Sequence, residues 1–525
     1  MMKDVVTAIK HQLPKFNDHL IRGLREREFD NLIEFIADGY RGCAKVISPD
    51  LVLLDYRVVS PVERLQSELR IPKALNTVNI SVDEAALVAY RFQYHDVVFE
   101  NMVYVPYLLE DGSVSIGGTR YECLLGMTEK SFSVEPDNTG FTIKLIRFPA
   151  SFWRTALHGF KDMATDKSFI GNVVYTRLHQ KFPPKAARRR PTALLYLMCR
   201  HSIEQVLGMF GFPSDSVVYD NPSQYDPNYY YFRAQKLTKS PTLLRVNKEL
   251  MDDNHMFRSV VATLVYILDS SQLSSFENMI ADSQMVYKII LGKLIYSNNL
   301  KREQALNNME KHLESVDDFM DSYTRSILAT GGIVVKDIYE LLVYVICNID
   351  RIIMSNAPNN LFNKKLEVVN GAVIGGMFEY LYRQAYSYEI KDDHNYMVNE
   401  VVTKALRTKP RQILKTLNMA DNVRFNPSVQ SDNWLITIGA KIVKRLSVMN
   451  MGSGKKASSG GIKSPVNRFH PSMAIVESMY GLGSSPGVNS LLNPYCQVNE
   501  VGVFVKDAWA AKIEKELNGI LQGYK

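Results

Sequence analysis

Long apolar runs are missing from this 525-residue sequence, and their absence argues against a membrane protein. No stretch of about 18 apolar residues occurs, which is the length that a helix needs to cross a bilayer. The opening residues carry charge throughout and lack the apolar centre of a signal peptide. We therefore expect the chain to stay in the cytosol of the cell that makes it.

Cysteine is scarce, and its spacing excludes two further classes of protein. The five cysteines stand far apart, with no Cys-x-x-Cys pair: Cys43, Cys123, Cys199, Cys347 and Cys496. This spacing excludes an ordinary cysteine zinc site and argues against a disulfide framework. We expect small buried apolar groups instead. The ten histidines show no His-Glu-x-x-His spacing, so neither a metal centre nor another cofactor is predicted for this chain alone.

Acidic residues are missing from one long stretch of an otherwise ordinary composition. Between Asn433 and Val476 there are seven basic residues and no acidic one: Lys441, Lys444, Arg445, Lys455, Lys456, Lys463 and Arg468. A second basic cluster holds Lys185, Arg188, Arg189 and Arg190. A solvated surface normally mixes both signs, whereas stripes of one sign are typical of a protein that binds a polyanion. Both stretches therefore predict contact with nucleic acid.

The glycine-rich segment 452–461, GSGKKASSGG, looks at first like a nucleotide-binding P-loop. A P-loop needs a glycine five positions before Gly454, and Met449 stands there. It also needs Ser or Thr after the lysine to hold magnesium, and Lys455 is followed by Lys456. An ATPase is therefore not favoured. The segment is expected to be a pliable basic loop.

Hydrophobic periodicity predicts a mixture of helices and strands. Residues 16–42 have apolar residues at helical spacing and end at a glycine, and residues 191–212 read as one helix that begins at a proline. Residues 50–150 have the texture of strands, with a hairpin signal around Asp111-Gly112. Residues 240–355 and 369–390 are expected to be mainly helical. The tail, 430–505, is expected to form loops and short strands before a closing amphipathic helix.

The final third carries an ordered series of motifs. Lys444-Arg445-Leu446-Ser447 precede the basic loop, and four motifs follow it: His470-Pro471, Ser485-Pro486-Gly487, Asn489-Ser490-Leu491 and Asn499-Glu500-Val501-Gly502. This series resembles the fork region of the β subunit of multisubunit DNA-directed RNA polymerases. Any one of these short matches would be weak, but their common order is specific.

Three earlier segments resemble the same family in the same order. Residues 103–125 resemble a strand that turns into a hairpin, with Gly117-Gly118 where the family has Asn-Gly. Residues 187–210 resemble an arginine-rich turn and the helix after it, and residues 359–384 resemble a later basic stretch and its helix. The resemblance implies an α+β multidomain fold with a largely helical middle section. Its expected parts are a protrusion (1–150 and 336–415), a lobe (151–335), and a fork region with a C-terminal helix (416–525).

Departures from the family pattern refine this reading. Ile442 stands where the family has a histidine of the rifamycin pocket, which predicts resistance to that drug. The Asp-x-Asp-Gly-Asp triad that holds catalytic Mg²⁺ in the family is not found, so the metal is expected on a β′-like partner. The chain also ends soon after the fork. It thus resembles the amino-terminal half of the split β subunits of giant, phiKZ-like bacteriophages, and a truncated β subunit is the alternative.

The resemblance implies roles for the basic residues. Lys455 and Lys456 would contact phosphates where downstream DNA separates, and Lys444, Arg445 and Ser447 would lie near the RNA–DNA hybrid. Lys463 and Arg468, of the same basic stretch, are expected to bind nucleic acid as well. His470 and Asn489 match motifs without an assigned role; for His470, fork packing and substrate contact both stay open. Arg188, Arg189 and Arg190 either grip DNA or pair with acids at a subunit interface.

The implied partners are a C-terminal β-like subunit, β′-like subunits with the triad, a phage promoter-recognition subunit, the DNA template and nascent RNA. The expected location is the cytoplasm of an infected bacterial host, a phage-derived compartment or the virion. A stand-alone viral nucleic-acid-binding or structural protein is the alternative function. Tyr229, Tyr230 and Tyr231 could stack bases, but buried strand aromatics are the expected use.

Overall fold

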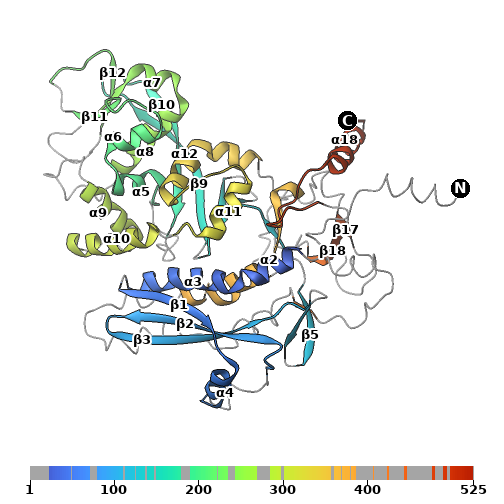
Figure 1. The fold of residues 1–525 in the computed structure, drawn as a ribbon. Coiled ribbons are helices and arrows are strands. Elements are labelled where there is room, and N and C mark those ends of the chain that lie inside the picture. The colour runs from blue at the N-terminus through green and yellow to red at the C-terminus, as the bar shows by residue number, and fades with distance from the viewer. Residues whose placement is uncertain are drawn as a thin grey trace, which may run out of the picture. The chain divides into compact units, whose positions relative to one another are not determined.

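The structure is a computed structural model (Figure 1). It describes residues 23–48, 50–70, 80–109, 113–116, 118–123, 126–135, 139–146, 149–178, 190–220, 223–233, 243–268, 284–296, 301–317, 319–355, 360–367, 369–378, 380–382, 384–385, 406, 423–424, 443–445, 476–478, 489–492 and 497–523. The chain divides into two compact units. The split unit comprises Met1–Ser131 and Ala357–Lys525, and the inserted unit is Phe132–Asn356.

In the split unit, helices α2 (Leu24–Asp30) and α3 (Leu32–Ile47) precede an antiparallel sheet in the order β1-β2-β3. The strands are β1 (Leu51–Val58), β2 (Ala85–Tyr94) and β3 (Val97–Pro106). The apolar stripe of α3 lies along this sheet (Figure 1), where the ring of Tyr40 packs against Tyr90 and Phe92. Helix α4 (Pro61–Arg70) follows β1.

The predicted end of the first helix at Gly42 is wrong, because α3 continues to Ile47. The two glycines of α3 serve close packing instead. A Cβ atom at Gly39 would overlap the Phe378 ring, and one at Gly42 would overlap the Tyr382 hydroxyl. Both aromatic residues belong to the predicted helical stretch 369–390, which contains α13 (Asn370–Val373) and the π-helical turn η5 (Ile374–Phe378). Phe378 ends η5, and Tyr382 follows it.

The predicted hairpin lies slightly later than the Asp111-Gly112 signal. Strand β3 pairs with β2, and the hairpin is formed by β4 (Ser113–Ile116) and β5 (Thr119–Cys123). Its turn contains Gly118 at φ +76°, the position that the family resemblance indicates. Buried Glu84 holds this turn: its carboxylate accepts hydrogen bonds from the Gly118 N–H at 2.6 Å and the Ser115 hydroxyl at 2.7 Å.

The described residues of the inserted unit form two antiparallel sheets. One has the order β10-β9-β8-β7, with β7 (Ser133–Val134), β8 (Gly140–Lys144), β9 (Pro149–Lys161) and β10 (Ser168–Arg177). The other has the order β11-β13-β12, with β11 (Val217–Asp220), β12 (Tyr229–Arg233) and β13 (Leu243–Asn247). Tyr230 and Tyr231 are buried at 2% and 1% exposure, which confirms the prediction of buried strand aromatics for these two residues.

Helices pack around these sheets in one hydrophobic core. They are α5 (Ala193–Arg200), α6 (Ile203–Met209), α7 (Lys248–Asp253), α8 (His255–Leu268), α9 (Gln284–Ile295), α10 (Arg302–Asp317), α11 (Ser322–Thr330) and α12 (Ile338–Ser355). The prediction of a largely helical middle section is thus confirmed. Helix α8 crosses β10 at Gly171, where a Cβ atom would lie 2.7 Å from the Arg258 carbonyl oxygen.

The single helix predicted over residues 191–212 is wrong, because two helices form there. Helix α5 ends at Arg200, and Ser202 then caps α6. The Ser202 hydroxyl accepts a hydrogen bond from the Gln205 backbone N–H, and the Gln205 side chain accepts one from the Ser202 backbone N–H. This capping box favours a new helix start over continuation. The prediction that the cysteines are buried holds for Cys43 and Cys199 but is wrong for Cys347, which is exposed on α12.

The sequence predicts short strands and a closing helix for the tail. Among the described residues of the tail, the strands are β16 (Val443–Arg445), β17 (Val476–Ser478) and β18 (Asn489–Leu492), and α18 (Ala508–Gly523) forms the helix. Within the described ranges, no helix is both long and apolar enough to cross a bilayer. The mixed helices and antiparallel sheets agree with the predicted α+β class. The assignment to protrusion, lobe and fork stays a prediction.

Candidate nucleic-acid interface

Most of the residues predicted to bind nucleic acid lie outside the described residues. These are Ser447, Lys455, Lys456, Lys463, Arg468, His470, Arg188 and Arg189. Lys444, Arg445, Asn489 and Arg190 are described. The candidate interface is therefore built here from those four and from the motif residues around them.

Lys444, Arg445 and Asn489 come together in one small sheet of the split unit. Strand β18 lies between β16 and β17, antiparallel to both. Its register sets Lys444 opposite Ser490, and Arg445 opposite Asn489. Directly opposed residues of an antiparallel pair have their Cα atoms only about 4.5–5.5 Å apart. The structure thus joins the backbones of the Lys-Arg and Asn-Ser-Leu motifs, which stand far apart in the sequence.

The Asn499-Glu500-Val501-Gly502 motif forms a tight turn. The Asn499 side-chain oxygen accepts hydrogen bonds from the N–H groups of Val501 at 3.1 Å and Val503 at 2.9 Å. Gly502 takes φ +80°, a left-handed conformation that glycine adopts without strain. The side chain of Asn499 is therefore occupied in shaping its own backbone, as asparagine commonly is in turns.

This turn is hydrogen-bonded to β14 (Lys364–Glu367). The strand contains Lys364-Lys365, the basic pair of the segment 359–384 that resembles the family. The Leu366 N–H donates to the Gly502 carbonyl at 2.7 Å, and a Cβ atom at Gly502 would overlap the Leu366 carbonyl oxygen. Only glycine fits such an approach. Strand β14 also pairs with β6 (Gly126–Glu129), which follows the β4–β5 hairpin. Two motif segments distant in sequence, together with the strand that follows a third, therefore meet at β14.

Lys365 on β14 is a buried cation with a local partner. Its ammonium lies 2.5 Å from the Glu367 carboxylate, and the two side chains are only 5% and 8% exposed. A buried Glu28 carboxylate accepts from the N–H groups of Val369 at 2.6 Å and Asn370 at 3.0 Å, just before α13. Lys365 thus stabilises the split unit from within. It is a basic motif residue without the exposure that a phosphate contact requires.

In the inserted unit, Arg190 is exposed and lies over an aromatic ring. Its guanidinium carbon is 5.5 Å from the centroid of the Trp153 ring, within the range of a cation–π interaction. Trp153 carries no sequence motif and was not among the predicted residues. Its one distinguishing feature is a position directly opposite Gly140 in the sheet, and that pairing is known only once the strands are aligned.

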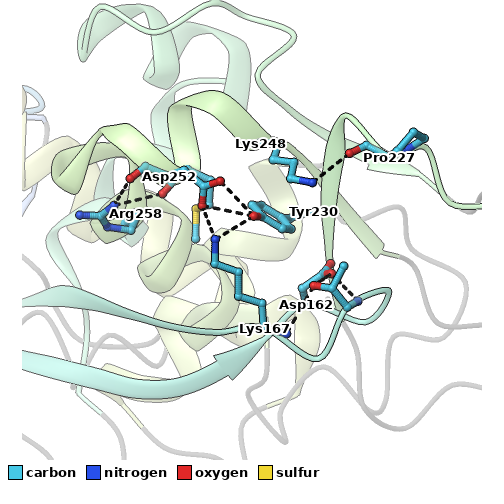
Figure 2. A network of polar contacts seen from close by, with 9 residues as sticks. Asp162, Lys167, Pro227, Tyr230, Lys248, Asp252 and Arg258 are labelled. Atoms are coloured by element: carbon cyan, nitrogen blue, oxygen red, sulfur yellow. Dashed lines mark hydrogen bonds and ion pairs between the residues drawn. The ribbon is translucent and has the colours of Figure 1, made fainter.

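A second polar cluster of the inserted unit joins the start of β12 to α7 (Figure 2). The Lys167 ammonium donates to Asp252 at 2.7 Å and to the Tyr230 hydroxyl at 3.0 Å, and that hydroxyl in turn donates to Asp252. Partial burial raises the pKa of the Asp252 carboxyl, but the bonds from Lys167 and Tyr230 outweigh it and lower that pKa. The bond to Asp252 and then that to Tyr230 raise the pKa of Lys167.

Asp162 extends the same cluster into the core (Figure 2). It is 1% exposed, and its carboxylate accepts from the Thr165 N–H at 2.7 Å, the Thr165 hydroxyl at 2.6 Å and the Tyr231 N–H at 2.7 Å. These bonds tie the β9–β10 turn to β12. Lys167 and Asp252 pair with each other, and Asp162 is satisfied by the donors of Thr165 and Tyr231, so these three residues act as a structural brace.

Comparison with known families identifies the class of protein to which these features belong. The model of a family described as "Non-virion RNA polymerase subunit" matches residues 1–516. The chain therefore belongs to this family of RNA polymerase subunits, and other polymerase subunits are its partners. No curated protein matches the chain.

Proposed function

We propose that the chain is the amino-terminal β subunit of a split-β, multisubunit DNA-dependent RNA polymerase of a giant, phiKZ-like bacteriophage. It forms one wall of the DNA cleft and contacts downstream DNA and the RNA–DNA hybrid. It contributes no catalytic Mg²⁺ ligand; the metal belongs to a β′-like partner with the Asp triad. The isolated chain is inactive, and a C-terminal β-like subunit completes the enzyme.

The observation that carries this proposal is the meeting of the fork motifs in space. Lys444 and Arg445 pair in register with Ser490 and Asn489. The Asn-Glu-x-Gly turn is hydrogen-bonded to β14, the strand that contains Lys364-Lys365. An accidental series of short matches has no reason to converge on neighbouring strands. The inserted unit, which interrupts a unit made of two chain segments, also supports a lobe within a protrusion.

Photo-crosslinking tests the proposed nucleic-acid contact. A photoreactive amino acid is placed at Arg445, in the β16 strand, and at Lys311 on α10 as a matched basic control. Elongation complexes are assembled on a labelled template and nascent RNA. The proposal expects crosslinks from position 445 to the template or the RNA near the growing end, and none from position 311. Equal labelling from both positions, or none from 445, contradicts it.

Drug sensitivity supplies an independent test of the fork assignment. With Ile442 in place of the family's histidine, transcription is expected to persist at rifamycin concentrations that silence the host polymerase. Transcription by the purified enzyme and by the host enzyme is measured in parallel over one titration of the drug. Equal sensitivity of the two enzymes would refute the expectation.

A further inference from the structure

The indole of Trp153 is held in a fixed orientation on the sheet of the inserted unit. Trp153 faces Gly140 on β8 and Tyr175 on β10 in register. A Cβ atom at Gly140 would come within 2.6 Å of the indole Cδ1, so the ring lies where only glycine leaves room. The indole Nε1–H donates to the Glu135 carboxylate at 2.9 Å. The ring is thus oriented from two sides while it remains partly exposed.

The backbone around Arg190 is anchored next to this ring. The Arg190 N–H donates to the Tyr266 hydroxyl at 3.4 Å, and the Tyr266 ring packs edge-on against Tyr175 at 5.4 Å. Immediately after it, the Pro191 carbonyl accepts from the Thr176 N–H at 2.9 Å. The chain then enters α5. These contacts hold the exposed guanidinium over the indole instead of leaving it on a free loop.

Arg190 differs from three ion-paired arginines of the same unit in how its charge is met. Arg154 pairs with Asp350, Arg200 with Asp317 and Arg245 with Asp220. In the part of the chain that the structure describes, no carboxylate pairs with Arg190. An aromatic ring holds the cation in place without neutralising it, so its charge stays available to an anion.

We propose that Arg190 and Trp153 together bind one nucleotide of a single-stranded nucleic acid. The guanidinium binds a phosphate, and the unpaired base stacks on the surface formed by the guanidinium plane and the indole. Unpaired bases stack on both kinds of surface, whereas a duplex hides its base faces. The proposal rests on the proposed function, because the polymerase brings melted DNA and nascent RNA to this chain.

An acidic segment of another subunit is the competing occupant of this site. It would use the cation of Arg190 but has no need of an oriented indole beside it. The Trp153 ring therefore favours the nucleic acid.

Binding of labelled oligo(dT) and oligo(U) to the full chain, purified with its copurifying subunits, tests this site. Fluorescence anisotropy is measured for the wild type, Arg190→Ala, Trp153→Ala and the conservative Trp153→Phe. Loss of stacking on one residue weakens single-strand binding roughly 5- to 100-fold, the range found for alanine substitutions at such sites. Trp153→Phe should retain most of the affinity, which guards against a variant that simply fails to fold.

Arg245→Ala is the matched control. Its guanidinium also lies over an aromatic ring, 4.8 Å from the Tyr229 centroid, but Asp220 neutralises it. Binding by this variant should equal that of the wild type. Tighter binding of oligo(U) assigns the site to nascent RNA, and tighter binding of oligo(dT) assigns it to melted DNA. Either result supports the proposal when Arg190→Ala abolishes the difference in affinity between the two oligonucleotides.

Two results overturn the proposal. One is unchanged oligonucleotide binding by Arg190→Ala and Trp153→Ala. The other is crosslinking from position 190 to an acidic segment of another subunit that neither oligonucleotide prevents. Both leave the proposed function standing if the purified complex still transcribes. Failure of the wild-type chain to copurify with a triad-bearing subunit defeats the proposed function instead, whatever the oligonucleotide assay gives.

Discussion

Replacing Gly502 by alanine should destabilise the split unit more than its backbone conformation alone explains. The left-handed conformation at φ +80° costs an alanine about 1–2 kcal/mol. The added Cβ atom also overlaps the Leu366 carbonyl oxygen and lies 3.2 Å from its carbonyl carbon. Relieving such an overlap by shifting packed backbone costs about 1–3 kcal/mol more. The total is therefore roughly 2–5 kcal/mol.

Gly118→Ala separates these two contributions within the same unit. Gly118 has nearly the same backbone conformation, φ +76°, but a Cβ atom there would meet nothing within 4 Å. It should cost only about 1–2 kcal/mol. Urea unfolding gives both free energies, and hydrogen exchange at residues 364–367 and 497–505 shows whether the turn separates from β14. Equal destabilisation by the two variants would refute the close approach of Gly502 to Leu366.

Three further predictions concern the buried carboxylates Glu84 and Asp162 and the basic loop. Glu84→Gln should lower the free energy of unfolding by about 1.5–3 kcal/mol, because a charged acceptor of the Gly118 and Ser115 bonds is lost. Glu63→Gln removes a partly exposed carboxylate that pairs with Arg57, and it should change this free energy much less; equal losses from the two variants would contradict the assignment. Asp162→Asn should destabilise the inserted unit by about 1.5–3 kcal/mol in urea unfolding, whereas Asp166→Asn, whose side chain is 81% exposed, should change it little. Replacing both Lys455 and Lys456 by alanine should reduce the log–log salt dependence of DNA binding by about 1.4–1.8; an unchanged slope would mean that the loop makes no phosphate contact.

The sequence predicted the element types well where periodicity is long and strong. The helical character of residues 240–355 and the closing helix at Ala508–Gly523 follow from apolar spacing alone. Glycine was harder to interpret. Gly42 looked like a helix end because glycine ends many helices, yet it lies inside α3 to admit Tyr382, a residue remote in sequence. Close packing of this kind is decided by a partner that local pattern does not contain.

The candidate site was predictable only in part for the same reason. The motif order identified Lys444, Arg445 and Asn489, but their registration in β16 and β18 depends on a pairing across the loop. Asn499 and Lys365 have the residue types of binding groups, and the structure shows instead a turn and a buried ion pair. Trp153 carries no motif at all; its importance comes from Gly140, Glu135 and Arg190, which only the folded sheet brings together.

The most direct test of the central proposal is the mass of every chain that copurifies with this one from infected cells. The chain is tagged, the complex is purified under native conditions, and mass spectrometry identifies its members. The account predicts a stable complex that contains a chain with an Asp-x-Asp-Gly-Asp triad and a chain that supplies the remainder of the β subunit. Recovery of this chain alone, or with partners of which none carries the triad, would contradict it.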